Sequence, residues 1–389
     1  MTPSSIRIAD PTPTDLDAVL DLQRRSFGPL PEVWQDWWRR RCESAMEERR
    51  LIGVFDGSRL IAQALLREFR QFWGGRELPM AGIAAVGVAP EDRGRGVASL
   101  LMGGAVRRAA ELGDVVSALY PAAVTLYRRQ GWEFAGAQHR VHIDPARLRF
   151  PGSGPVPVRR ATADDVDAMI EHVRQHWAAV GASGPKVLDA VTLEPYLSDP
   201  GTFCYLADGG LLIYRWKDGD LAVDHLTARD QATLQTFWSI VGSGSSVAES
   251  VRANLGPRDP LHLLLGDGAS GDTHVERWML RLIDAPAAIA RRGYPPSAQV
   301  DLPLTVADPL APACDGSWRL RVNDGAGTLE RTSGADDDLR LGPNGLAAMY
   351  AGTPLVTLRA TGLATGGRPE DDRRLDEAFA ADPYLLEYF

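Results

Sequence analysis

The 389-residue sequence contains little cysteine and no long hydrophobic run. Its three cysteines, Cys42, Cys204 and Cys314, are far apart and form no C-x-x-C pair, so we expect neither a disulfide framework nor a zinc site. No apolar stretch approaches the roughly 20 residues that a bilayer span requires. Because Met1 to Asp15 also lacks the pattern of a secretory signal, we expect a cytoplasmic protein with no membrane partner.

The chain also lacks an excess of positive charge. Its net charge of -9 argues against nucleic acid as the main partner and mildly favours cationic substrates such as amines. Lysine is scarce and occurs only at Lys186 and Lys217, which we interpret as coding bias in an arginine-rich chain. The length predicts two to three domains, each able to bury its own core.

A turn rich in glycine and arginine is the most informative segment present. Residues 86–98 read V-G-V-A-P-E-D-R-G-R-G-V-A, an alternating apolar run followed by this turn, and a helix is predicted over Ser99 to Leu112. Unpaired N–H groups at a helix start favour a phosphate, and Gly94 and Gly96 let the backbone come close. The turn is neither a Walker loop nor a Rossmann fingerprint, since Ser99 stands where the third glycine belongs. An ordinary strand-to-helix connection is the alternative interpretation.

The surroundings of this turn resemble the GNAT family of N-acetyltransferases. R-G-R-G-V-A fits the acetyl-CoA signature R/Q-x-x-G-x-G/A, a V-x-V strand precedes it, and a second strand and helix are predicted within Val115 to Trp132. The resemblance implies that the strand pairs with the pantetheine arm of acetyl-CoA and that the turn holds its pyrophosphate. The implied cofactor-binding residues are Val86, Gly87, Val88, Arg93, Gly94, Arg95, Gly96, Val97, Ala98, Ser99, Ala122 and Ala123.

The first 150 residues are partly repeated in the next part of the chain. The run I-R-I-A-D-P-T-P-T-D-L-D-A-V-L from Ile6 matches V-P-V-R-R-A-T-A-D-D-V-D-A-M-I from Val156 without gaps. The second copy has T-A-R-D-Q-A, without glycine, between a predicted strand at Leu221 to Leu226 and a helix from about Gln231. We therefore interpret it as a degenerate copy that binds no pyrophosphate and walls the substrate cleft.

Composition shifts toward Pro, Gly and Asp after Ile283, which indicates a third domain. The segment L-G-P-N-G-L-A-A-M-Y-A-G-T, Leu341 to Thr353, resembles the sterol-carrier-like fold. The predicted elements are strands Trp318–Asn323, Gly327–Thr332 and Leu339–Leu341 and helices Gly345–Tyr350 and Asp372–Ala381. The apolar ending D-P-Y-L-L-E-Y-F is predicted to dock against protein.

The expected architecture is thus α/β (α+β), with tandem GNAT folds followed by a sterol-carrier-protein-like domain. We place the domain limits at 1–150 for the catalytic domain, 151–284 for the degenerate one and 285–389 for the last. Together these parts resemble the enhanced-intracellular-survival (Eis) acetyltransferases over the whole chain. The resemblance implies amine acceptors such as aminoglycosides and lysine side chains, and assembly as a homohexamer.

Two catalytic roles follow from that resemblance. It makes Tyr127, in L-Y-R-R-Q-G-W, the acid that protonates the departing thiolate; a phenol with a pKa near ~10 keeps its proton at neutral pH. Tyr120, at the end of the preceding strand, is the rival. The base is the terminal carboxylate of Phe389, whose ordinary pKa of roughly 3.5 requires either burial or a relaying water.

The acceptor pocket is expected around the N-terminal helices, where aromatic faces could stack on a substrate or hold a cation. The candidate residues are Ser26, Phe27, Trp34, Trp37 and Trp38, with Glu387 from the tail. Several Eis proteins carry acids where this chain has Ser26 and Tyr388, which makes aminoglycosides less secure as substrates.

His172 and His176 lie at i and i+4 on one predicted helix, but without a third ligand we expect no metal. We therefore expect an acetyl-CoA-dependent N-acetyltransferase that transfers directly to a primary amine in a ternary complex. Alternatives are a non-catalytic scaffold that binds CoA or lipid, and an enzyme whose acceptor is a protein lysine or N-terminus.

Overall fold

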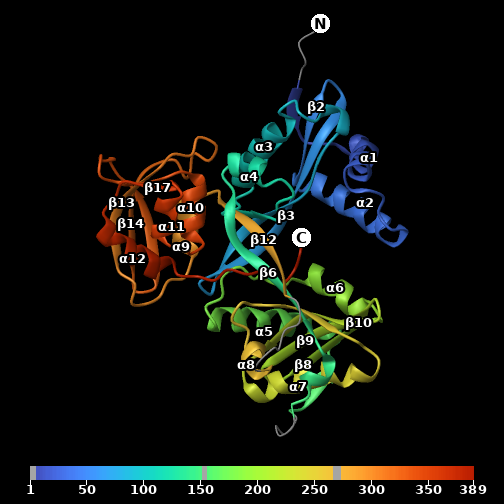
Figure 1. Ribbon diagram of the computed structural model, residues 1–389. Helices are drawn as coiled ribbons and strands as arrows, with labels where there is room; N and C mark the ends of the chain where they lie inside the picture. The colour runs from blue at the N-terminus through green and yellow to red at the C-terminus, as the bar shows by residue number, and fades with distance from the viewer. Residues whose placement is uncertain (1–5, 151–155, 266–272) are drawn as a thin grey trace.

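The computed structural model describes residues 6–150, 156–265 and 273–389, and the chain forms three units. Figure 1 shows them in chain order: a blue-to-cyan unit, a green-to-yellow unit below it, and an orange-to-red unit at the side. The C-terminus leaves the third unit and returns to the centre of the molecule. That return places the last residues beside the first two units.

The first unit begins with a strand and two helices and continues into long antiparallel strands. Its elements are β1 Ile6–Ala9, α1 Leu16–Phe27, α2 Glu32–Glu47, β2 Leu51–Asp56, β3 Arg59–Trp73, β4 Arg76–Val88, α3 Val97–Glu111, β5 Val116–Leu119, α4 Val124–Arg129 and β6 Glu133–Ile143. The helix expected over Ser99 to Leu112 is thus present and begins two residues earlier. Short 3-10 turns span Pro13–Asp15, Pro90–Asp92 and Pro145–Leu148.

The second unit repeats this order. Its elements are β7 Val158–Arg160, α5 Val166–Ala179, α6 Ala190–Ser198, β8 Thr202–Ala207, β9 Gly210–Lys217, β10 Asp220–Ala228, α7 Gln231–Gly242, β11 Val251–Leu255, α8 Leu261–Leu265 and β12 Thr273–Leu282, with 3-10 turns at Ala163–Asp165 and Ser243–Ser246. The repeat extends to the helix caps: the Thr12 N–H donates to Asp15 at 2.8 Å, and the Thr162 N–H donates to Asp165 at 2.9 Å. Both threonines stand just before the first turn of a helix, where an acidic partner satisfies an otherwise unpaired N–H.

The third unit is a five-stranded sheet with helices, in the order β15-β14-β13-β16-β17. Its elements are α9 Ala285–Arg291, β13 Val300–Val306, β14 Gly316–Asn323, β15 Ala326–Arg331, β16 Leu339–Leu341, α10 Pro343–Tyr350, α11 Leu355–Ala360, β17 Ala364–Thr365 and α12 Pro369–Phe379. The three strands and two helices expected from the sequence are present within a few residues of their expected bounds. The central strand β13 was not among the expectations.

One continuous sheet of twelve strands joins the first two units, and the units exchange strands at its centre. The order is β1-β2-β3-β4-β5-β12-β6-β11-β10-β9-β8-β7. Strand β12, from the second unit, pairs with β5 of the first, while β6 pairs with both β12 and β11. Neither copy therefore completes its own sheet, and the two units form one structural body.

The hydrophobic core of the first unit continues into the third. Trp73 on β3 lies with its ring centroid 4.8 Å from that of Tyr350 on α10, inside one cluster of buried residues that spans both units. Arg292 lies in the same cluster, fully buried among aromatic rings, and donates to the carbonyl oxygens of Tyr350 and Phe379. No helix among the described residues is both long enough and apolar enough to cross a membrane.

Candidate active site

Strands β4 and β5 lie side by side for only three residues and then separate. Their parallel pairing joins Met80–Gly82 to 116–118 and ends there. Beyond that point β4 stays paired with β3, and a bulge places Ala85 at a φ of 51°. Bulges re-aim the backbone next to active sites, and the free edge of β4 can pair with an extended ligand as an added strand would. This edge contains Val86, Gly87 and Val88, and it suits the pantetheine arm expected there.

The turn after β4 leads into a helix start that carries no side-chain cap. Gly94 and Gly96 have φ angles of 79° and 77°, and a Cβ atom added to either would meet nothing within 4 Å. Helix α3 begins at Val97 with Gly96 as its N-cap and without a side-chain hydrogen bond at the cap. The first N–H groups of a helix have no acceptor within it, and they carry partial positive charge. The backbone from Arg93 to Ser99 therefore fits a diphosphate.

The two arginines of this turn have different surroundings. The Arg95 guanidinium pairs with Asp92 and, at 3.1 Å, with Asp56, so two carboxylates already neutralise its charge. The Arg93 side chain is exposed and forms no ion pair with any residue of the described ranges. Of the two side chains, Arg93 is therefore the one suited to contact a phosphate.

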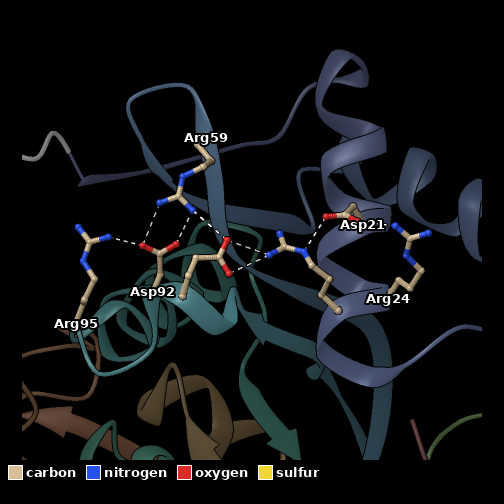
Figure 2. Close-up of polar contacts among 7 residues, drawn as sticks. Asp21, Arg24, Arg59, Asp92 and Arg95 are labelled. Carbon is tan, nitrogen blue, oxygen red and sulfur yellow. Dashed lines mark hydrogen bonds and ion pairs between the residues drawn. The ribbon is translucent and has the colours of Figure 1, made fainter.

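A network of ion pairs fixes the turn to helix α1, as Figure 2 shows. Asp92 is 2% exposed and accepts hydrogen bonds from Arg59 at 2.6 and 3.1 Å, and these bonds lower the pKa of its carboxyl. Glu91 bridges Arg59 and Arg25 of α1 at 3.5 and 3.1 Å. The charged groups thus connect the cofactor turn to the helix that carries Ser26.

The corresponding helix of the second copy is capped by an acid. The Asp230 side chain accepts from the Thr233 N–H at 2.8 Å at the start of α7. Strands β10 and β11 pair over 221–223 and 251–253, much as β4 and β5 do. Because a carboxylate already occupies the helix N-terminus, that end would repel a diphosphate. This arrangement supports the interpretation of the second copy as degenerate.

Tyr127 lies on the short helix α4, directly after the exposed Ala122 and Ala123. Its side chain is 5% exposed. Burial raises the pKa of its hydroxyl, and the nearby Tyr388 adds to that rise. The phenol therefore keeps its proton at neutral pH, as an acid for a departing thiolate must.

The C-terminal tail crosses the centre of the large sheet before it ends in the first unit. The Leu385 N–H donates to the Ala137 carbonyl at 3.2 Å, and Gln138 and Asn254 donate to the Leu386 carbonyl at 3.1 and 2.6 Å. These partners lie on β6 and β11, so the tail contacts strands of both copies. The expectation that the apolar tail docks against protein is confirmed.

Phe389 lies where β4 and β5 begin to separate. Its residue is 8% exposed, and its ring centroid is 5.3 Å from that of Phe69 and 5.6 Å from that of Tyr120. A Cβ atom on Gly82, the last paired residue of β4, would lie 2.9 Å from the Phe389 ring. The fold therefore brings the end of the chain to the gap where the thioester is expected, next to Tyr120, which directly follows β5.

Tyr120, the rival acid, has its hydroxyl engaged by the tail. It donates to the Glu387 carbonyl at 3.2 Å, and its ring stacks on Tyr388 at 4.3 Å. Burial raises its pKa, and the Glu387 charge adds to the rise. A hydroxyl already donating to a backbone carbonyl is less suited to protonate a leaving group, so Tyr120 fits a role in holding the tail.

The expected acceptor residues lie at the end of α1 and along α2. Phe27, Trp34 and Trp37 are exposed. Ser26 has a buried hydroxyl without a hydrogen-bond partner, and a Cβ atom on Gly87 would lie 2.7 Å from its oxygen. The structure therefore brings the end of α1 directly against the cofactor strand. Trp38 lines a separate pocket of about 430 Å³ between α1 and α2, together with acids such as Asp17, Asp21 and Asp36.

Glu387 has a cation partner within the chain. Its carboxylate lies 3.8 Å from the ammonium of Lys186, on the loop between α5 and α6. The sequence did not indicate Lys186 as a site residue, nor Asn344 of α10, whose side chain donates to the carbonyls of Arg128 and Trp132 near α4. The scarcity of lysine was visible in the sequence, but nothing in it indicated that one of two lysines would lie against the tail.

His172 and His176 are half-buried on α5 of the second unit, and His172 lines a pocket that also contains Asp208. The His172 Nε2 atom is 3.0 Å from the Thr227 hydroxyl, and the two imidazole centroids are 6.5 Å apart. Within the described residues, no group of three or more His, Cys, Asp or Glu side chains is placed to hold a metal ion.

Known protein families match three consecutive parts of the chain, and these parts correspond to the three structural units in order. Residues 7–135 and 166–282 each match an acetyltransferase (GNAT) domain family, and residues 285–386 match the sterol carrier protein domain family. The boundary between the two GNAT matches falls close to the start of the internal repeat.

Several full-length proteins resemble the chain throughout. The N-acetyltransferase Eis of Mycobacterium tuberculosis is 28% identical over 85% of each chain, and an uncharacterised N-acetyltransferase of Streptomyces avermitilis is 28% identical over 94% of this chain and 95% of its own. The crystal structure of a GCN5-related N-acetyltransferase from Kribbella flavida is 47% identical, with a TM-score of 0.96 over 99% of both chains. The structure of Eis1 from Mycobacterium abscessus, 21% identical with a TM-score of 0.77, shares the fold. The chain is therefore an acetyltransferase that belongs to the GCN5-related N-acetyltransferases of the Eis type.

Proposed function

We propose that this enzyme transfers the acetyl group of acetyl-CoA directly to a primary amine, with Tyr127 as the acid and the Phe389 carboxylate as the base. The observation that carries the proposal is the convergence of three distant segments. The uncapped start of α3 follows strand β4, Tyr127 on the helix after β5 has Tyr388 of the tail nearby, and the Phe389 ring lies against Gly82 where β4 and β5 separate. The family matches supply the reaction class, and this geometry supports the assignment of roles.

In this proposal, the first copy binds acetyl-CoA through its diphosphate and its pantetheine arm. The N–H groups from Arg93 to Ser99 would hold the diphosphate, and the free edge of β4 would pair with the pantetheine amides. Donors on that edge near the bulge at Ala85 would polarise the thioester carbonyl. The second copy would bind none, because Asp230 caps its helix.

The transfer removes two protons from the acceptor ammonium and supplies one to sulfur. The Phe389 carboxylate accepts the first proton, directly or through water, and the freed amine forms a C–N bond as the C–S bond breaks. Tyr127 donates its hydroxyl proton to the thiolate of CoA, and its phenolate regains a proton from the newly acetylated nitrogen, directly or through water. No acyl-enzyme is required, so both substrates must be bound together in a ternary complex.

The acceptor is proposed to be an amine on a small molecule or on a peptide. The exposed aromatic faces of Phe27, Trp34 and Trp37 can hold a cation or a ring, and a protein lysine or N-terminus remains the second acceptor class. Ser26 and Tyr388 provide no acid, and Lys186 already pairs with Glu387. We therefore expect monoamines to be better substrates than polycationic acceptors, whether polyamines or aminoglycosides.

Three further expectations remain proposals. We place the domain limits at 1–150, 151–284 and 285–389. The exchanged strands β6 and β12 each pair with strands on the other side of the first boundary. From the resemblance to the Eis family we expect a homohexamer, and we place the enzyme in the cytoplasm without a metal, nucleic-acid or membrane partner.

The decisive experiment measures CoA release with a panel of amines, for the natural chain and for a chain extended by one glycine after Phe389. The extension moves the carboxylate away from the site and leaves the aromatic ring in place. We expect acetyl transfer to at least one amine and a loss of about 100-fold or more in kcat upon extension, the scale of a lost general base.

A glycine inserted before Ile6 serves as the matched control, because it lengthens the other end of the chain. Unchanged kcat after the C-terminal extension would refute the base assignment. Absence of acetyl transfer by the natural chain, despite measurable acetyl-CoA binding, would favour the scaffold alternative.

A further inference from the structure

Lys186 and Glu387 form an ion pair that is almost entirely enclosed between the second unit and the tail. Lys186 is 8% exposed, and its ammonium lies 3.8 Å from the Glu387 carboxylate. Burial lowers the pKa of Lys186 and raises that of Glu387, and in each case the charge of the other residue opposes the shift. Enclosing two charges is costly, and such pairs are retained in some proteins to fix a specific arrangement.

The backbone around Lys186 is held against the first unit. The Phe72 N–H donates to the Pro185 carbonyl at 2.9 Å, and the Val187 N–H donates to the Arg70 carbonyl at 2.9 Å. Lys186 itself bridges to Gln71 in the manner of a short strand. The loop of the second unit is thus fixed to β3, and the ammonium position is fixed with it.

The same ammonium faces the last residue of the chain. It lies 4.2 Å from the centroid of the Phe69 ring and 5.4 Å from that of the Phe389 ring. Such distances allow a cation to be attracted to both ring faces. Lys186 therefore forms an ion pair with Glu387 and a cation–π contact with the Phe389 ring. These two residues flank Tyr388 in the sequence.

Backbone hydrogen bonds hold the tail only up to this point. The carbonyls of Leu386 and Glu387 accept from Gln138, Asn254 and Tyr120. Beyond Glu387, the contacts that the described residues provide are made by the rings of Tyr388 and Phe389. The location of the terminal carboxylate thus depends on how firmly Glu387 and the Phe389 ring are held.

We propose that Lys186 is a positioning residue that acts through Glu387 and the Phe389 ring to fix the C-terminal carboxylate at the active site. The second copy, although unable to bind pyrophosphate, would thereby support catalysis in the first. This inference rests on the proposed role of the carboxylate as the base. It also changes the expected role of Glu387, from binding an acceptor amine to anchoring the tail.

The first test measures how fast carboxypeptidase A releases Phe389, followed by mass spectrometry of the intact chain. Lys186→Met should be trimmed about tenfold faster than the natural chain, a change on the scale of one lost ion pair. Lys186→Arg, which keeps the charge, should restore slow trimming. Lys217→Met is the matched control, because Lys217 is the only other lysine and is exposed.

Lys186→Met leaves Glu387 buried without its cation, so this variant could fail to fold. The double variant Lys186→Met/Glu387→Gln removes both charges and avoids that penalty, and its trimming should also be about tenfold faster. Trimming of the folded variants at the natural rate would overturn the proposal. Because this assay needs no turnover, its result can be read even if the natural chain acetylates no amine.

The second test separates anchoring from general loss of structure. Lys186→Met should lower kcat for an amine acceptor about tenfold, with acetyl-CoA affinity by calorimetry unchanged, and Lys186→Arg should recover most of the activity. An equal loss of acetyl-CoA affinity would indicate a merely structural role and contradict the proposal. Loss of activity upon C-terminal extension without any effect of Lys186→Met would refute the anchor and leave the proposed base intact.

Discussion

At the scale of single residues, the two proposed proton-transfer groups differ in what holds them. Tyr127 is buried on a helix and has a raised pKa, whereas the Phe389 carboxylate is held through neighbouring rings and the tail. A phenol with a raised pKa remains an acid over the whole working range, so the pH dependence of the reaction should arise from the base and from the acceptor amine.

This difference predicts the shape of the pH profile. For an acceptor amine, kcat should fall as the pH falls and the base becomes protonated, and it should show no alkaline decline below about pH 10, the ordinary pKa of a phenol. Burial raises the Tyr127 pKa, so the deprotonated, inactive form appears only at still higher pH. The measurement is kcat against pH at saturating substrates.

Tyr127→Phe removes the acid and keeps the ring. We expect kcat to fall about 100-fold or more, while acetyl-CoA binding by calorimetry changes little. Tyr120→Phe is the matched comparison, and it should retain more activity because the Tyr120 hydroxyl serves the tail. A larger loss in Tyr120→Phe than in Tyr127→Phe would reverse the assignment of the acid.

At the scale of elements, helix α3 has a glycine at each end, and the two glycines share nearly the same left-handed φ angle. Gly96, the N-cap, has a φ of 77°, and Gly113, just beyond the C-terminus, has a φ of 78°. A Cβ atom on either would meet nothing within 4 Å. Alanine at either site should therefore cost a similar amount of stability, since the cost comes from the left-handed backbone alone.

Gly96→Ala and Gly113→Ala form a matched pair of variants. Each should lower the free energy of unfolding by about 1–2 kcal/mol, as thermal denaturation would show. Only Gly96→Ala should weaken acetyl-CoA binding, by about tenfold or more, because only this end holds the diphosphate. Equal effects of both variants on binding would argue against the anion site.

Helix α4 depends on the third unit for its C-terminal end. The Asn344 side chain on α10 donates to the carbonyls of Arg128 and Trp132 at 3.0 and 2.9 Å. The Arg128 carbonyl near the end of α4 already accepts from the Gly131 N–H at 3.1 Å, so Asn344 adds a second bond there and another just beyond the helix, at Trp132. Asn344 thus positions the helix that carries Tyr127.

Asn344→Ala should lower kcat about tenfold with little change in acetyl-CoA affinity, since a misplaced acid affects the chemical step most directly. Steady-state kinetics and calorimetry measure the two quantities. Asn323→Ala, an exposed position in the same unit, is the matched control and should leave both unchanged. A loss of acetyl-CoA affinity without a loss of kcat would contradict the role of Asn344 in positioning Tyr127.

The elements that were predicted correctly from the sequence are those with a short-range sequence signal. The turn at Arg93 to Gly96 and the repeat that starts at Ile6 and Val156 have short-range signals, and both are present. The exchange of β6 and β12 has no such signal, because it depends on pairing between strands that are far apart in the sequence. Lys186 contacts the tail although the two are far apart in the sequence, and residue type and spacing alone cannot predict such a contact.

At the scale of the whole molecule, all three units contribute to the proposed site. The first provides the cofactor strand and turn, the second provides Lys186 and strand β12, and the third provides Asn344 and the tail. Exchanged strands and a shared core make these contributions mutually dependent. The chain therefore contains two copies of one fold and, on this account, a single acetyl-CoA site.

Calorimetric titration of the full chain with acetyl-CoA tests this claim most directly. The account predicts one bound molecule per chain, with binding lost in Gly96→Asp, which places a negative charge at the start of α3 where the diphosphate is proposed to bind. Two bound molecules per chain would contradict the degenerate second copy. No binding, or unchanged binding in Gly96→Asp, would contradict the anion site at the start of α3.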